Sequence, residues 1–142
     1  MVLSIIFMIL NWIAFSGWMF VCYKLLVLCR SWNDDGYGDI DWMRRIQKPV
    51  LFLEGICVIE VLRILLGQLK GNFILGVILH AIRLLTVLET MVRLPNHWTG
   101  PFILGSWAIT EIFRYPMYMF PNNQLCRSIR MVVPIVTFPI GA

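Results

Sequence analysis

Long apolar runs separated by short polar segments dominate the chain. A helix needs about 20 mostly apolar residues to cross the hydrocarbon core of a bilayer. Four runs reach this length, at about residues 2–28, 49–69, 72–92 and 101–120, and a shorter fifth apolar segment covers residues 128–142. None of them alternates apolar and polar residues with the period of two that is typical of barrel strands. The pattern predicts an all-α fold, a helical transmembrane bundle with four spans and a short fifth apolar segment.

The segments between these runs are short. Residues 30–48 are expected to form the one substantial polar loop. Turns are predicted at residues 68–72, 94–100 and 121–123, where Gly, Pro and Asn cluster. No repeat or low-complexity tract separates one part of the chain from another. We therefore expect residues 1–142 to form a single helical membrane domain.

Composition supports a membrane protein. Hydrophobic residues make up 59% of the chain, charged residues only 14%, and the mean hydropathy is +0.77. Soluble domains carry about 25% charged residues. The net charge of +4 comes from Lys and Arg that flank the apolar runs, so nothing indicates binding to nucleic acid.

The first apolar run is predicted to be a retained span. It lacks the basic start of a removed signal peptide, and its apolar stretch is longer than such a peptide needs. Loop 30–48 carries four Lys or Arg residues, and such loops favour the cytoplasmic side of a membrane. We expect this loop to face the cytosol or the mitochondrial matrix, with the N-terminus on the other side.

The metal-binding residue types show no recognisable spacing. The four cysteines and two histidines are Cys22, Cys29, Cys57, Cys126, His80 and His97. No two cysteines form C-x-x-C, and the histidines have no ligand spacing with them. On this basis we expect no metal or haem site and no cofactor, and we interpret the cysteines as small apolar helix residues.

Charged residues inside the apolar runs are the strongest candidates for function, because ionisable groups are costly at membrane depth. Glu60 and Arg63 are three residues apart, as are Glu111 and Arg114, which places each pair on one helix face. Arg83 has no acidic partner at that spacing and must find one outside its own helix. Two interpretations stay open: the groups pair and fix the packing, or they line a polar cavity for an anionic or hydroxylated ligand. The candidates for the cavity or for an interface are Glu60, Arg63, Arg83, Glu111, Arg114 and Tyr115.

Several of these residues lie in motifs of a known family. The segment LEGICVIEVLRILLG (53–67) resembles the E-V-L-H-x-L-x-G motif of the 3-hydroxyacyl-CoA dehydratases, the PTPLA-like or Pasticcino-type proteins of very-long-chain fatty acid elongation. The segment GSWAITEIFRYPMYMF (105–120) is similar to the family's A-W-S-x-T-E-I-I-R-Y-x-F-Y. Further matches are Asn11 and Gly17-Trp18 in the first run, Arg83 at the family's S-R pair, and Arg130 eight residues before Phe138.

The resemblance also identifies what the chain lacks. In the family the Tyr and Glu of Y-P-x-G-V-x-x-E are the catalytic pair, and dehydration needs a base for the α-proton and an acid for the departing hydroxyl. Phe138 stands at the Tyr position, and the Glu position falls beyond the last residue. The resemblance thus implies no catalytic residues at the matching positions. Glu111 and Tyr115, four residues apart, are the candidates for a substitute pair.

We therefore expect a catalytically inactive, dehydratase-like membrane protein that serves as a structural accessory subunit of a larger membrane complex. Its expected partners are membrane lipids, held in a lipid-binding cavity, and other membrane subunits. Its expected location is the inner mitochondrial membrane or the endoplasmic reticulum, the usual home of the family. The alternative is an active 3-hydroxyacyl-CoA dehydratase, and a third reading is a regulatory lipid- or acyl-binding protein.

Overall fold

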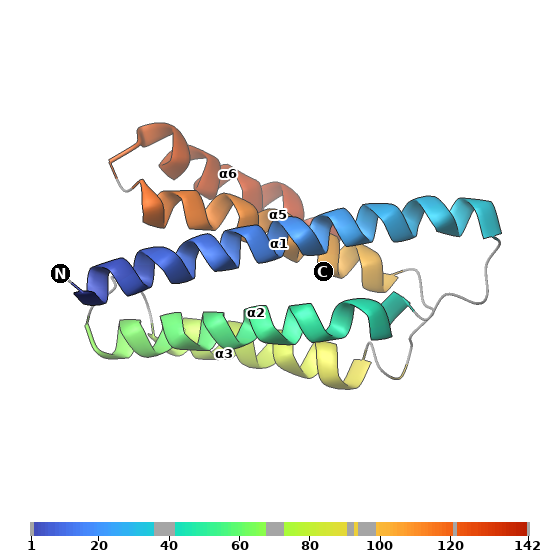
Figure 1. Ribbon diagram of the computed structural model, residues 1–142, viewed down its shortest axis with the longest axis horizontal. Coiled ribbons are helices and arrows are strands. Elements are labelled where there is room, and N and C mark those ends of the chain that lie inside the picture. The colour runs from blue at the N-terminus through green and yellow to red at the C-terminus, as the bar shows by residue number, and fades with distance from the viewer. Residues whose placement is uncertain are drawn as a thin grey trace. The chain divides into compact units, whose positions relative to one another are not determined.

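The chain is helical throughout the part that the structure describes (Figure 1). This computed structural model describes residues 2–35, 42–67, 73–90, 93, 99–120 and 122–141. The helices are α1 (Val2–Asp35), α2 (Trp42–Leu65), α3 (Phe73–Leu85), the π-helical turn η1 (Thr86–Thr90), α5 (Thr99–Met119) and α6 (Gln124–Gly141). No strand occurs within these ranges, which confirms the predicted all-α class.

The predicted transmembrane spans are supported to different degrees. Among the helices in the described ranges, α1 is long and apolar enough to cross a membrane, over Leu3–Arg30, by length and composition. The other helices are shorter or carry more charged residues in their apolar stretches. Four spans therefore stay a prediction, of which α1 is the part that the structure supports.

The predicted polar loop over residues 30–48 is wrong in its extent. Helix α1 continues to Asp35 and α2 already begins at Trp42, so the connection itself falls in residues 36–41, outside the described residues. A drop in hydropathy marks where apolar burial ends. It does not end a helix, because residues such as Arg44 have high helix propensity.

Two prolines lie inside helices. Pro49 lies inside α2 and Pro116 inside α5, although the sequence suggested that the second span begins at Pro49. A proline within a helix removes one backbone hydrogen bond and bends the helix. The rest of each helix is long enough to continue past the defect.

The structure describes two of the helix ends in detail. Asn122 and Asn123 connect α5 to α6, as predicted, and the Asn123 side-chain oxygen accepts a hydrogen bond from Leu125 N at 2.9 Å, which caps α6. Gly67 follows α2 with a φ of 71°, a conformation that glycine adopts without strain. The turns predicted at 68–72 and 94–98 lie outside the described residues, and Thr99 already belongs to α5.

The helices form two compact units. The first consists of residues 1–40 and 97–142 and contains α1, α5 and α6. The second consists of residues 41–96 and contains α2, α3 and η1. The prediction of a single membrane domain is not tested by this grouping and stays a prediction.

Helix α5 packs against both α1 and α6 in the first unit. Buried residues on α1 recur at alternating spacings of three and four: Asn11, Ala14, Trp18, Val21, Leu25 and Leu28. Helix α5 repeats this spacing with Pro101, Leu104, Ala108, Glu111 and Tyr115. Such spacing keeps the buried side chains on one face of a helix.

Helices α2 and α3 pack against each other in the second unit. They approach closely at Gly76, where an added Cβ would lie 3.5 Å from a methyl group of Val61. Helix α3 then widens into the π turn η1. At that point the Thr86 hydroxyl donates a hydrogen bond to the carbonyl of Ile82 at 2.8 Å, which supplies a donor where the backbone spacing changes.

Candidate functional site

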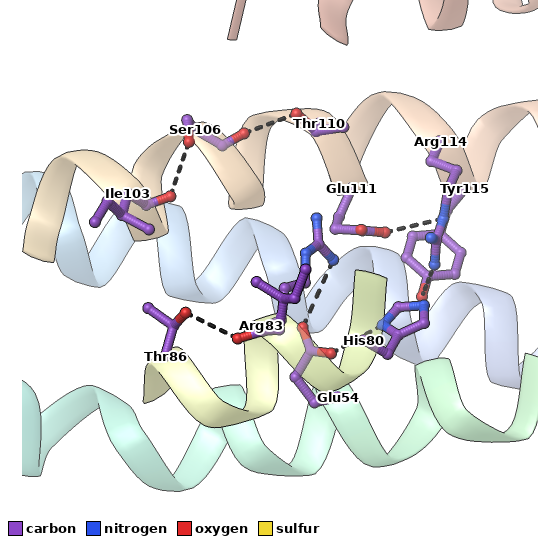
Figure 2. A network of polar contacts seen from close by, with 11 residues as sticks. Glu54, His80, Arg83, Thr86, Ile103, Ser106, Thr110, Glu111, Arg114 and Tyr115 are labelled. Carbon is purple, nitrogen blue, oxygen red and sulfur yellow. Dashed lines mark hydrogen bonds and ion pairs between the residues drawn. The ribbon is translucent and has the colours of Figure 1, made fainter. Parts of the chain in front are cut away.

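A buried ion pair on α5 is the centre of the polar cluster in the first unit (Figure 2). Arg114 Nε lies 2.9 Å from Glu111 Oε2, and the two side chains are 13% and 1% exposed. One helical turn separates the residues, so the helix itself brings the charges together. The shared helix face expected from their spacing is confirmed, and the two side chains form an ion pair.

The Arg114 guanidinium also contacts two tyrosines. Its Nη2 donates a hydrogen bond to the Tyr115 hydroxyl at 3.2 Å, and its Cζ lies 5.1 Å from the centre of that ring and 5.9 Å from the ring of Tyr118. From α6, Arg130 lies 5.8 Å from the Tyr118 ring and donates a hydrogen bond to Met117 Sδ at 3.0 Å. Cations at these distances are attracted to the ring faces. Two arginines and two tyrosines thus form one cationic and aromatic cluster on α5 and α6.

Two threonine hydroxyls join the same helices. Thr110 Oγ1 and Thr137 Oγ1 lie 2.8 Å apart, and each is also within hydrogen-bond distance of a carbonyl four residues earlier in its own helix, at Ser106 and Val133. Two hydroxyl protons cannot serve three contacts that each need a donor. One threonine therefore donates to its own helix while the other donates across to its partner. Phe138 follows Thr137 on α6, and its side chain lies outside the described residues.

The second unit holds a polar cluster between α2 and α3 (Figure 2). His80 Nδ1 lies 3.1 Å from Glu54 Oε2, a hydrogen bond in which the ring N–H donates to the carboxylate. Arg83 Nη1 lies 3.6 Å from the other oxygen of the same carboxylate. All three side chains are buried. The prediction that Arg83 finds its partner on another helix is confirmed, and the partner is Glu54.

Cys57 belongs to this cluster as well. One ligand atom from each of Glu54, Cys57 and His80 can be chosen so that all three lie within 4.8 Å of one another. The sequence pattern does not associate these residues, because Cys57 and His80 lie on different helices and their separation along the chain resembles no known ligand spacing. One feature of the sequence does point to this cluster: Glu54 is a second carboxylate in the same apolar run as Glu60.

Among the remaining charged residues are a pair of candidates on α2 and a pair at the end of η1. Glu60 is buried and Arg63 half-buried on α2, and their pairing with each other stays a prediction. At the end of α3 and η1, Arg93 contacts Glu89 at 2.7 Å. That pair is exposed, at 78% and 58%, so it resembles an ordinary surface ion pair.

These arrangements limit the chemistry that the described residues can do. Glu111 is already engaged with Arg114, and the Tyr115 hydroxyl accepts a hydrogen bond from the same guanidinium. Both members of the candidate substitute pair therefore contact the same guanidinium.

Comparisons with known proteins show similarity to one family. Residues 55–142, more than half of the chain, match the family model described as "Protein tyrosine phosphatase-like protein, PTPLA". A curated relative from Arabidopsis thaliana, "Very-long-chain (3R)-3-hydroxyacyl-CoA dehydratase PASTICCINO 2", is 27% identical over 113 residues. The aligned region covers 78% of this chain and 49% of the relative, so the chain spans about half the length of that protein. No solved structure matches the chain.

The family model covers most of the polar residues singled out from the sequence, including Glu60, Arg83 and the cluster around Arg114. The resemblance inferred from short motifs therefore holds over a continuous stretch of the chain. This chain belongs to the PTPLA family of dehydratase-like proteins.

Proposed function

We propose that this chain is a membrane-embedded member of the family that does not dehydrate 3-hydroxyacyl-CoA and acts as a structural accessory subunit of a larger membrane assembly. The observation that carries the proposal is Phe138. It occupies the position of the tyrosine in the family motif Y-P-x-G, here F-P-I-G, so the flanking Pro139 and Gly141 fix the alignment.

The consequence of Phe138 is chemical. Removing water from a 3-hydroxyacyl thioester requires one group to take the α-proton and another to protonate the departing hydroxyl. A phenyl ring can do neither. The candidates for substitution, Glu111 and Tyr115, are both held by Arg114 in the described geometry. This supports a role other than catalysis.

The apolar surface of the helices supports membrane embedding. Large contiguous apolar patches are rare on soluble monomers and mark contacts with lipid or with other proteins. Large apolar side chains are largely exposed on every helix, among them Leu26, Phe52, Ile74, Phe102, Met131 and Ile135. In a membrane these side chains contact acyl chains or neighbouring subunits, which makes lipids and membrane proteins the proposed partners.

The buried charges support an accessory role in a different way. A non-catalytic protein has no use for the ion pair of Glu111 and Arg114 in proton transfer, and buried ion pairs are a poor source of stability compared with apolar packing. Their use would be specific recognition, with Arg114, Arg130 and the tyrosine rings holding an anionic group of a lipid or of a partner subunit.

The activity test uses the purified chain in detergent with a long-chain 3-hydroxyacyl-CoA. Formation of the 2-enoyl product is followed by mass spectrometry, with PASTICCINO 2 as the positive control because its name states this activity. We expect no product above the level without protein. Turnover that disappears in Glu111→Gln or Tyr115→Phe would refute the proposal and establish an active dehydratase.

The assembly test follows the tagged chain on native gels after mild extraction. The chain is expected to migrate in an assembly larger than the purified chain alone, and Arg114→Leu is expected to release it. The exposed pair supplies the control, since Arg93→Leu removes the same charge from a surface site. Migration of the unmodified chain as a single copy would refute the accessory role.

Membrane topology is tested independently by labelling single added cysteines. Four spans place residue 39 and residue 122 on opposite sides of the membrane, so a membrane-impermeant maleimide should reach one of them from each side. Labelling of both positions from the same side would rule out the four-span arrangement.

A further inference from the structure

We propose that Glu54, Cys57 and His80 form a binding site for one divalent metal ion of the Zn²⁺ type, which joins α2 to α3. The ligand atoms of the three residues lie within 4.8 Å of one another, and all three side chains are buried. The proposed accessory role uses none of these residues, so the metal site is tested independently of it.

The positions of the three residues suit a common ligand. Glu54 and Cys57 are three residues apart on α2, which places them on the same face of that helix. His80 comes from α3, which packs against α2. Each helix therefore contributes to the site through its regular backbone, with no loop that would have to be ordered first.

The distances are close to those of an occupied site. Zinc bonds of about 2.0–2.3 Å in a tetrahedron place neighbouring ligand atoms about 3.3–3.8 Å apart. His80 Nδ1 and Glu54 Oε2 are 3.1 Å apart, and no pair in the set is separated by more than 4.8 Å. Bringing a pair of ligand atoms from 4.8 Å to such a distance requires a shift of about 1 Å.

The donor atoms select the kind of metal. A thiolate, an imidazole and one carboxylate are the ligand types that bind Zn²⁺, whereas Mg²⁺ and Ca²⁺ prefer oxygen alone. Three protein ligands leave a fourth position for water or another group. On binding, the Cys57 thiol would release its proton to solvent and the Nδ1 proton of His80 would move to Nε2, which leaves Nδ1 and the Glu54 oxygen available to the ion.

Arg83 supports the site as an outer contact. Its guanidinium lies 3.6 Å from Glu54 Oε1, while the other oxygen, Oε2, is the one that contacts His80. The contact orients the carboxylate so that one oxygen remains for the metal. Outer contacts of this type usually change metal affinity by about 10- to 100-fold.

The test uses Co²⁺ as a spectroscopic probe for Zn²⁺, added to the purified full chain in detergent. A cobalt ion bound to Cys57 gives a thiolate charge-transfer band and the intense visible bands of tetrahedral geometry, and Zn²⁺ should abolish both by displacement. We expect one ion per chain. The triple variant Cys22→Ser/Cys29→Ser/Cys126→Ser retains the three ligands and should give the same spectrum.

Ligand variants complete the test. Cys57→Ser should abolish the charge-transfer band, and His80→Gln should weaken Co²⁺ binding by more than about 100-fold, beyond the usual effect of an outer contact. Arg83→Gln should weaken it by about tenfold. A ligand variant that loses its helical circular dichroism is unfolded and cannot be used. The test then depends on the triple variant, in which Cys57 is the one cysteine and must account for any thiolate band. Absence of a thiolate band in the triple variant, or undiminished binding in folded Cys57→Ser, would overturn the proposal.

Discussion

Removing the Arg114 side chain is expected to destabilise the first unit through the charge that it leaves behind. At an effective dielectric constant of about 20, two unit charges separated by the 2.9 Å of the Arg114–Glu111 contact attract by about 6 kcal/mol. Desolvation offsets most of this attraction in the intact pair. In Arg114→Leu the Glu111 carboxylate, 1% exposed, keeps the desolvation cost and loses the partner.

Breaking a buried pair usually costs about 3–5 kcal/mol. Because Arg114 is 13% exposed and water reaches part of the pair, we expect the lower end, about 3 kcal/mol. The double variant Glu111→Leu/Arg114→Leu leaves no charge. It loses the contacts of Arg114 with Tyr115, worth about 1–2 kcal/mol, and gains apolar packing, so it should be more stable than Arg114→Leu alone.

The measurement is the free energy of unfolding in mixed detergent micelles, followed by circular dichroism for both single variants and the double variant. The double variant should lose less unfolding free energy than the sum of the two single losses, by at least about 2 kcal/mol. Arg93→Leu, which breaks the exposed contact with Glu89, should cost less than about 1 kcal/mol. Additive effects at Glu111 and Arg114, or an equal loss at Arg93, would show that the burial of the pair does not govern its energetics.

Three further predictions concern contacts between helices and a helix end, and the same unfolding measurement checks them. Arg83→Leu leaves the carboxylate of Glu54 buried with only His80 as a described contact and should cost about 3 kcal/mol; a loss below about 1 kcal/mol would contradict this. Thr110→Val should cost about 1 kcal/mol, and adding Thr137→Val should cost little more, because the two hydroxyls share one contact; independent losses would argue against the shared bond. Asn123→Ala should cost about 1 kcal/mol by uncapping α6, whereas Asn123→Asp keeps the acceptor and should cost nothing, so equal losses would exclude capping as the cause.

Hydropathy and spacing along the sequence predicted those features that depend on one helix at a time. The long apolar runs gave the all-α class, and the three-residue spacing of Glu111 and Arg114 gave their ion pair, because a helix fixes the relation between such neighbours. Helix ends were less predictable. Residues 31–35 and 42–48 are more polar than the apolar runs beside them, yet both segments are helical, because a polar surface does not interrupt backbone hydrogen bonds.

The sequence pattern does not predict which residues contact one another between helices. Arg83 required a partner on another helix, but which residue is that partner depends on how α2 and α3 align along each other. His80 and Glu54 are 26 residues apart, and a shift of one helix by a single turn, about 5.4 Å, would separate them. The association of Cys57 with His80 has the same origin, which is why a search for adjacent ligands along the chain could not find it.

The π-helical turn that follows α3 has a consequence for changes in chain length. A π turn contains one residue more than an α-helical turn, so deleting a residue within Thr86–Thr90 converts it to ordinary α-helix. A deletion elsewhere in α3 rotates all later residues by about 100° and would separate Arg83 or His80 from α2. Single-residue insertions and deletions among homologous chains should therefore concentrate at this turn. A length change there leaves His80 and Arg83, which precede it, in place against α2.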